Sequence, residues 1–503
     1  MTVPADTSPA GPFSGSRDRF ETLLSFLEAD EAAALSHAEL EHRLEVDGRE
    51  VLRQLLQDHL DLRAQNETRL EAVIDAGGVP RGSVEAGHER TLTTVFGDVV
   101  VRRLAYRRRG HSNLHPADGA LNLPEERHSH GLRRLAALEA TRGSFAGAVE
   151  AIGRATGQPL GKRQVEELAG RTAADFDEFY AGRQQPQDGD PDDVLVISAD
   201  GKGIVMRPDA LRPATAEAAA QATTKLETRL SKGEKRNRKR MAEVGTVYNI
   251  APAPRSPADI LPAAEEGGEA TAAPVARNKW LTASVVDDAA SVVGQVFDEA
   301  ERRDPQHRRT WVALVDGNNH QIHRIGAEAQ ARGVTVPIVC DFVHVLEYLW
   351  RAAWCFYDEG DPAAESWVHD KARSVLSGET GKVAAAIRRK ATNHGLSTAQ
   401  RANADRCADY LTNKKPYLGY PTALERGWPI ATGVIEGACR HLVKDRMDIT
   451  GARWGLDGAE AVLKLRALHC NGDFDDYWRF HLSRERQRVH EARYAKNVIP
   501  QAA

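Results

Sequence analysis

Runs of apolar residues in the middle of the chain predict a group of strands. The clearest run lies in VLVISADGKG, residues 194–203, where four apolar residues are followed by small ones and then by Asp200. A short continuous apolar run is typical of a strand that is buried on both faces. Further strand-like runs occur at 243–250, 280–286, 310–316 and 334–340. We therefore predict a sheet in this region, with helices between several of its strands.

Helical spacing of apolar residues predicts three further regions. The stretch 20–75 has this spacing, as in VLRQLLQDHLDL (51–62), and its helices either pack on a core or pair two subunits. Residues 346–425 are predicted to be wholly helical. The segment 433–455 is predicted to be one more helix, and it carries Glu436.

Two patterns in the first 180 residues are typical of DNA-binding elements. Residues 90–108 alternate and contain β-branched and aromatic residues, which predicts a hairpin. The stretch 132–180 predicts two short helices, a break at TGQP (156–159), and a third helix whose first turn carries Lys162 and Arg163. That order is the outline of a helix-turn-helix, although any small helical bundle gives a similar pattern.

The composition is that of a globular protein with several domains. The 503 residues suggest roughly three or four domains of ~100–200 residues, and 41% hydrophobic with 28% charged residues is ordinary for a folded chain. We expect no membrane span and no secretory signal. The five cysteines are an odd number without a C-x-x-C pair, which favours reduced thiols and a cytoplasmic location.

The charge is distributed unevenly along the chain. The net charge is −5 and the pI is about 6.4, but RRLAYRRR (102–109) has five arginines in eight residues. A second basic run, at 225–240, has eight basic residues against two acidic ones. Each run is either a solvated surface or a phosphate-binding segment. In the second interpretation, Arg102, Arg103 and Arg107 contact DNA.

Three carboxylates follow the predicted elements at similar intervals. Asp200 and Asp316 each end a predicted strand, and Glu436 lies on the later helix, with 116 positions between the first pair and 120 between the second. Carboxylate oxygens are preferred ligands of Mg²⁺ or Mn²⁺, and two such ions can activate and stabilise the oxygens of a phosphodiester reaction. The layout fits a ribonuclease-H-like sheet, with residues 346–428 as a helical insertion.

Five segments together resemble a known family. ISADGKGIVMRP, KRMAEVGTVYNI, VALVDGNNH, VCDFVHVLEYLW and TGVIEGACRHLVKDRMDITGARWGLDGAEAVLKLRAL look like the ISKra group of bacterial insertion-sequence transposases, which are DDE enzymes. The resemblance runs from about residue 90 to 480. It implies a ribonuclease-H-like catalytic domain in which Asp200, Asp316 and Glu436 bind two Mg²⁺ or Mn²⁺ ions.

The resemblance also implies an accessory element and a set of partners. CDFVH matches a C/D-x-x-H element through Asp341 and His344, and Asp341 competes with Asp316 for the place of second metal ligand. Expected partners are double-stranded DNA, both as terminal inverted repeats and as target, and further copies of the chain. The expected location is the bacterial cytoplasm, in contact with the nucleoid. Some relatives carry a cysteine-rich zinc module, but no cysteine precedes Cys340 here.

These expectations give an α/β protein with helical domains: a ribonuclease-H-like core with an all-α insertion, after helical and helix-turn-helix-like regions. Lys202, Arg440 and Lys444 lie near the three carboxylates in sequence and are candidate phosphate contacts, or surface charges. The rival functions are a glycosidase and a domesticated DNA-binding protein without catalysis.

The expected segments are 1–85 (helical), 86–131 (basic, β-rich), 132–180 (helix-turn-helix-like), 181–192 (linker), 193–345 with 429–470 (catalytic), 346–428 (insertion) and 471–503 (tail).

Overall fold

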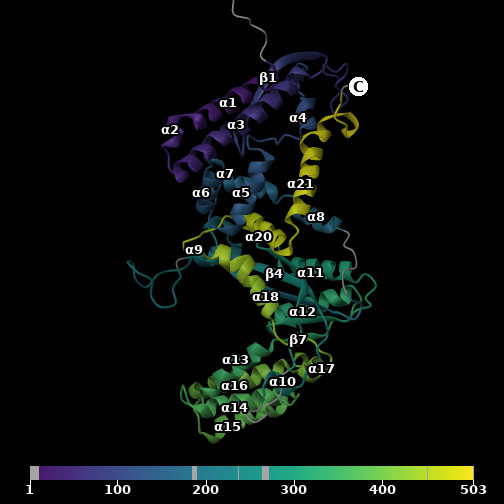
Figure 1. The fold of residues 1–503 in the computed structure, drawn as a ribbon. Coiled ribbons are helices and arrows are strands. Elements are labelled where there is room, and N and C mark those ends of the chain that lie inside the picture. The colour runs from purple at the N-terminus through teal and green to yellow at the C-terminus, as the bar shows by residue number, and fades with distance from the viewer. Residues whose placement is uncertain (1–10, 184–189, 236, 263–270, 450, 502–503) are drawn as a thin grey trace, which may run out of the picture. The chain divides into compact units, whose positions relative to one another are not determined.

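The chain folds into two compact units, which we describe separately (Figure 1). Unit 1 consists of Met1–Tyr180 and Phe474–Ala503, and unit 2 of Ala181–Asp473. The computed structural model describes residues 11–183, 190–235, 237–262, 271–449 and 451–501. No helix in these ranges has both the length and the apolar character needed to cross a membrane.

Unit 2 is built on a mixed five-stranded sheet. Its strand order is β5-β4-β3-β6-β7, in which β4 runs antiparallel to both of its neighbours while β6 and β7 run parallel to β3. The strands are β3 (Val194–Val205), β4 (Lys239–Ile250), β5 (Arg277–Ser284), β6 (Trp311–Val315) and β7 (Ile338–Cys340). The predicted strands are therefore confirmed, and the protein is a mixed α/β protein with additional helices.

The central position of β3 explains its continuous apolar run. The strand has neighbours on both sides, and its first six residues are buried. Ser198 pairs with Leu314 of the parallel strand β6. Asp200 and Asp316 each follow two positions later, beyond the last β3–β6 pair. Asp316 lies past the end of β6, as predicted, but Asp200 does not end its strand, because β3 continues to Val205 and Asp200 pairs with Val244 of β4.

Helices pack on this sheet and complete unit 2. The helix α11 (Ala289–Arg303) contacts β3, β4 and β5, and α20 (Leu456–Asn471) contacts β5. The remaining helical elements outside the insertion are η1 (Pro208–Ala210), α9 (Pro213–Ala220), α10 (Pro257–Ile260), α12 (Asn319–Ala331), α18 (Gly433–Ala438), η3 (Cys439–Lys444) and α19 (Asp445–Met447). The predicted helix at 433–455 is shorter than expected, because its helical elements end at Met447.

The insertion between β7 and α18 is helical, as predicted. Its elements are α13 (Phe342–Ala353), α14 (Pro362–Leu376), α15 (Thr380–Asn393), α16 (Thr398–Asn413), η2 (Lys415–Tyr417) and α17 (Tyr420–Glu425). Tyr348 of α13 stacks on Tyr410 of α16 with ring centroids 4.2 Å apart. The helix pairs α13–α16 and α15–α16 make the most extensive contacts, so α16 holds the insertion together.

Unit 1 combines a long helical hairpin, a two-stranded sheet and a group of short helices. Its elements are α1 (Ser14–Glu28), α2 (Asp30–Ala33), α3 (His37–Gln65), β1 (Ser83–Thr94), β2 (Gly97–Arg107), α4 (Pro116–Ala120), α5 (His130–Arg142), α6 (Phe145–Thr156), α7 (Lys162–Thr172), α8 (Phe176–Gly182, which runs into unit 2), α21 (Phe474–Val489), η4 (Glu491–Arg493) and η5 (Ala495–Asn497). The predicted hairpin is present, while helix formation near the N-terminus stops at Gln65 rather than near residue 75.

The three helices α5, α6 and α7 contact one another, in the order expected for the helix-turn-helix-like region. The break between α6 and α7 follows from Gly157, which caps α6 in the left-handed conformation at φ 70°. Lys162 and Arg163 lie exposed on the first turn of α7. This is a compact helical group with a basic helix start.

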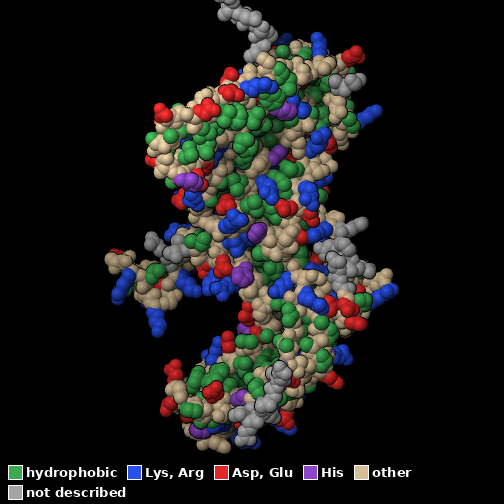
Figure 2. Space-filling view, in the orientation of Figure 1, with side chains coloured by type: hydrophobic (Ala, Val, Ile, Leu, Met, Phe, Trp, Pro, Cys, Tyr) green, Lys and Arg blue, Asp and Glu red, His purple; other side chains and the backbone are tan. Residues whose placement is uncertain are grey.

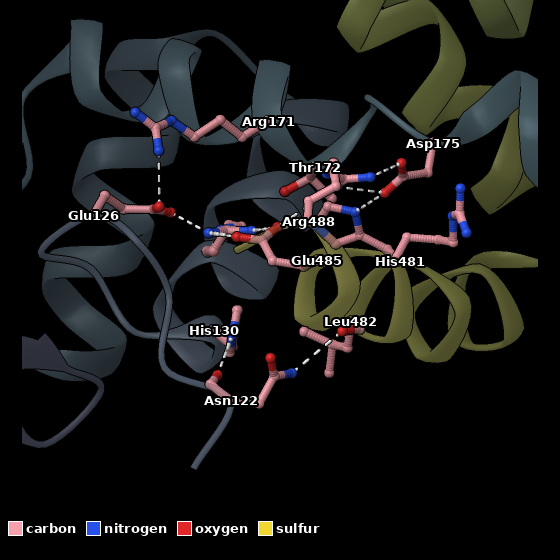
Figure 3. Close-up of polar contacts among 12 residues, drawn as sticks. Asn122, Glu126, His130, Arg171, Thr172, Asp175, His481, Leu482, Glu485 and Arg488 are labelled. Carbon is pink, nitrogen blue, oxygen red and sulfur yellow. Dashed lines mark hydrogen bonds and ion pairs between the residues drawn. The ribbon is translucent and has the colours of Figure 1, made fainter. Parts of the chain in front are cut away.

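The segment 471–503, expected to be a tail, contains the helix α21, and this helix is part of unit 1. Its His481 and Glu485 are buried against α5 and the start of α8 (Figure 3). Arg133 of α5 donates to Glu485 Oε1 at 2.8 Å and to Oε2 at 2.5 Å. His481 Nδ1 donates to Asp175 Oδ2 at 2.7 Å, and Arg488 Nη2 to the same oxygen at 3.0 Å. Charged side chains therefore fix α21 in place.

Acid is expected to weaken this buried network. Burial alone would raise the pKa of Asp175, but hydrogen bonds from His481 and Arg488 outweigh it and hold the pKa at about 2, below its ordinary 3.8. The charged form therefore stabilises unit 1 above pH 4, by roughly 2 kcal/mol, and this contribution disappears as the pH falls from about 4 to 2. Hydrogen exchange of α21 amides between these pH values measures the loss. In Asp175→Asn this part of the pH dependence should be absent.

Candidate active site

Asp200 lies on the central strand and contacts two other elements. Its Oδ1 accepts hydrogen bonds from the Gly201 amide at 2.7 Å and from Gln321 Nε2 of α12 at 3.3 Å. Its Oδ2 accepts from Cys439 Sγ at 3.4 Å. Cys439 follows Glu436 by three positions, so this contact brings the segment that carries Glu436 to the strand that carries Asp200. The segments α18 and η3 both pack on β3.

Asp316 follows β6 and is half-buried. Its Oδ1 accepts from the Asn318 amide at 2.7 Å, and its backbone carbonyl accepts from the Tyr410 hydroxyl at 3.5 Å. Gly317 has φ +95°, and a Cβ there would lie 2.7 Å from the Tyr410 oxygen. Glycine is needed at this position because of both the backbone conformation and the close approach of α16. The insertion thus touches the loop of a candidate ligand.

Glu436 is exposed on α18, and its Oε1 lies 3.0 Å from Thr432 Oγ1. The next segment, η3, is a π-helix. Single π-helical turns are rare and are found frequently at functional sites. Because a π-helix bonds residues five rather than four apart, Glu436, Arg440 and Lys444 are not spaced along this segment as they would be on an α-helix. Arg440 and Lys444 are both exposed, and Arg440 lies 3.8 Å from Asp445.

Asp341 is fully buried at the start of α13 and connects to Glu436 through one hydroxyl. Its Oδ2 accepts from Thr432 Oγ1 at 2.7 Å and lies 3.0 Å from His344 Nδ1. The Asp341 amide donates to the Val315 carbonyl of β6 at 2.8 Å, one residue before Asp316. Asp341 therefore lies at the same sheet edge as Asp316, while its side chain reaches Thr432.

Electrostatic effects agree with this arrangement. Burial alone would raise the pKa of Asp341, but hydrogen bonds from His344 and Thr432 outweigh it and lower the pKa. The pKa of His344 is raised, mainly by its hydrogen bond to Asp341 and also by the charge of Asp316. Burial raises the pKa of the Cys439 thiol, and the charges of Asp200 and Glu436 raise it further. Cys439 is therefore a neutral thiol beside two carboxylates.

The tightest group of possible metal ligands differs from the predicted trio. Among the described residues, Asp341, His344 and Glu436 form the group whose ligand atoms lie within 4.8 Å of one another. Asp200 and Asp316 are not members of this group. In each of them one carboxylate oxygen is hydrogen bonded to a nearby backbone amide. Asp200, Asp316 and Glu436 are all residues of unit 2, but among the described residues their oxygens do not form a group of possible ligands within 4.8 Å of one another.

Three residues at this site were not identified from the sequence. Thr432 bridges Asp341 and Glu436, Cys439 contacts Asp200, and Gln321 donates to Asp200. Thr432 could have been identified from the sequence, because it lies four positions, about one helical turn, before Glu436. The other two depend on contacts between segments that are distant in sequence.

Besides Arg440 and Lys444, the candidate DNA contacts fall into three groups. Lys202 is half-buried two residues beyond Asp200, and its charge offsets a small part of the rise in the pKa of Cys439. Lys162 is exposed, and Arg163 is exposed and donates to Glu167 at 2.9 Å. The third group is the hairpin arginines of β2.

These hairpin arginines are paired with carboxylates of unit 1. Arg102 donates to Glu89 at 2.7 Å and to Asp61 at 2.8 Å. Arg107 pairs with Glu85. Arg103 is buried and lies 2.8 Å from Asp118, so its guanidinium is not on the surface. The expectation that Arg103 contacts DNA is therefore at odds with its position: a strand alternates its side chains, and Arg103 points inward with Val101 and Ala105.

Comparison with known proteins adds no relative. Neither the protein-family models nor the curated proteins contain a match to this chain.

Proposed function

We propose that the chain is a DNA transposase with a ribonuclease-H-like catalytic core, which cuts and transfers DNA strands with the help of divalent metal ions. The observation that carries the proposal is the contact of Cys439 with Asp200, which joins the helix of Glu436 to the central strand. The mixed sheet supports the same fold, because Asp200 lies on β3 and Asp316 follows the adjacent parallel strand β6, each two positions beyond the last pair between these strands. The five sequence segments that resemble ISKra transposases supply the reaction class.

The donor set at this edge suits hard divalent cations. Asp200, Asp316 and Glu436 would hold two Mg²⁺ or Mn²⁺ ions, with Asp341 as the competing ligand, because carboxylate oxygens are what these cations prefer. Bound ions would polarise a phosphodiester and stabilise the attacking and leaving oxygens. Glu436 is exposed and free to approach a substrate-bound ion, while Thr432 and His344 orient the carboxylates around it.

DNA would be bound by cationic side chains in both units. In unit 2, Lys202, Arg440 and Lys444 lie next to the site residues in the chain and would neutralise phosphate charge. In unit 1, Lys162 and Arg163 at the start of α7 would approach a groove of the element ends. Further copies of the chain, and a place in the bacterial cytoplasm on the nucleoid, belong to the same proposal.

A cleavage assay with and without metal tests this function. We expect the full chain to cut DNA that carries the flanking ends of its own genomic locus in Mg²⁺ or Mn²⁺, and to lose all cutting in a chelator while it still binds the ends. DNA cutting that survives the chelator would overturn the metal-dependent mechanism. A glycosidase would instead cut no DNA under any condition and would hydrolyse a sugar substrate in the chelator. Binding without cutting at any metal concentration would instead identify a domesticated DNA-binding protein.

A further inference from the structure

The hairpin of α1 and α3 leaves one of its faces uncovered within unit 1. The two helices run antiparallel, since the Ser16 hydroxyl donates to Asp58 at 2.6 Å near one end and Arg43 lies over the Phe26 ring near the other. A second face of α3 packs on β2, where Gln57 bonds the Val100 backbone. A third face of α3, which carries Leu52, Leu55 and His59, is exposed within the described part of unit 1.

This third face is apolar in the middle. On α3 it carries Leu44, Leu52 and Leu55, which are 37%, 47% and 39% exposed. On α1, Phe20 and Leu24 are 49% and 36% exposed. Figure 2 shows a band of hydrophobic side chains over the region of α1 and α3. A contiguous apolar band of this kind is typical of a protein interface.

Charged residues flank the band with a symmetric spacing. Glu41 and Glu45 lie eleven and seven positions before Leu52, and His59 and Arg63 lie seven and eleven positions after it. Seven and eleven residues are close to two and three helical turns, so all five residues share one stripe of α3. All five are exposed. The stripe is thus acidic at one end, apolar at its centre and basic at the other end.

We propose that this face binds a second copy of the chain, through antiparallel packing of α3 on α3 about a two-fold axis at Leu52. In that arrangement Glu41 lies opposite Arg63 of the partner subunit, and Glu45 lies opposite His59 of the partner subunit. A two-fold interface uses the same patch on both copies, so the patch must complement itself, and this stripe does. Gly48, four positions before Leu52, leaves room for a second helix to approach.

The dimer forms without DNA and does not depend on the proposed function. Sedimentation velocity tests whether the dimer forms. The full chain is measured without DNA over a range of concentrations. We expect a monomer–dimer equilibrium in the wild-type chain. Leu52→Glu places two carboxylates against each other at the axis and should raise the dimer dissociation constant by about 100-fold or more. Val46→Glu is the matched control, because Val46 is 48% exposed on a different side of α3.

A charge exchange distinguishes a second copy from any other occupant. Glu41→Arg with Glu45→Arg, and separately His59→Glu with Arg63→Glu, should each weaken self-association, because like charges then face each other. Mixing the two variants in equal amounts should restore dimers, since every pair across the interface is again opposite in sign. The proposal is overturned if the wild-type chain is monomeric at all concentrations. It is equally overturned if dimers persist in Leu52→Glu, or if the mixture is no better than its components.

Discussion

Replacing Asp200 with asparagine is expected to lower the rate of DNA strand cleavage about 1,000-fold. The substitution removes one carboxylate charge from the proposed metal site on the central strand. A loss of several kcal/mol of charge stabilisation in the transition state corresponds to a tenfold loss of rate for every 1.36 kcal/mol. Asparagine keeps an oxygen that can accept from the Gly201 amide. The fold of the strand should therefore remain, and single-turnover cleavage in Mg²⁺ measures the effect.

Binding to the element ends is the control for this variant. We expect the affinity of Asp200→Asn for end DNA to match the wild type, because the candidate end-binding residues Lys162 and Arg163 lie in unit 1. Loss of binding and cleavage together would contradict this separation.

The same cleavage assay on Asp316→Asn and Asp341→Asn identifies the second ligand. The ligand variant should lose activity at every metal concentration, whereas a variant in a positioning residue should recover part of it at high metal.

Replacing Arg133 with methionine is expected to destabilise unit 1 by about 3–5 kcal/mol. Arg133 is fully buried and pairs with both Glu485 and Glu126, so its removal leaves buried carboxylate charge without a partner. Hydrogen exchange in α5 and α21 measures the change, because it reports on these helices separately from unit 2.

The neighbouring residue offers a matched control. Arg134 also pairs with a residue of α21, Asp475, but both side chains are largely exposed, at 41% and 72%. An exposed pair contributes little, so Arg134→Met should change stability by less than about 1 kcal/mol. Equal effects of the two substitutions would contradict the importance of burial. A double variant, Arg133→Met with Glu485→Met, should regain part of the lost stability, since it leaves one buried charge fewer.

The parts of the fold that could be predicted depend on local patterns. The continuous apolar runs before Asp200 and Asp316 indicated buried strands, and the position of Asp316 after its strand followed from sequence. The prediction that Asp200 ends its strand was wrong, because β3 continues to Val205 through pairing with β4, which a local apolar run does not reveal. The alternation of side chains along β2 also indicated that Arg103 points inward. The many basic residues around it suggested instead that Arg103 is exposed on the surface.

Other features depend on contacts that a sequence does not display. The helix α21 contains charges of both signs, and two of its buried side chains are His481 and Glu485. Its apolar residues therefore do not recur at a helical spacing that would have predicted a buried helix. The bridge from Thr432 to Asp341 joins positions 91 apart. The π-helical turn after Glu436 differs from an α-helix in its hydrogen-bond register rather than in its composition.

The division of unit 1 between two distant stretches of the chain has a consequence for biosynthesis. A ribosome finishes all of Ala181–Asp473 before it makes α21, which contributes Glu485 and His481 to the interior of unit 1. Domains generally fold as they emerge, but here the first unit to be started is the second to be completed. A premature stop codon just after residue 473 would leave unit 2 whole and unit 1 without the partners of Arg133 and Asp175.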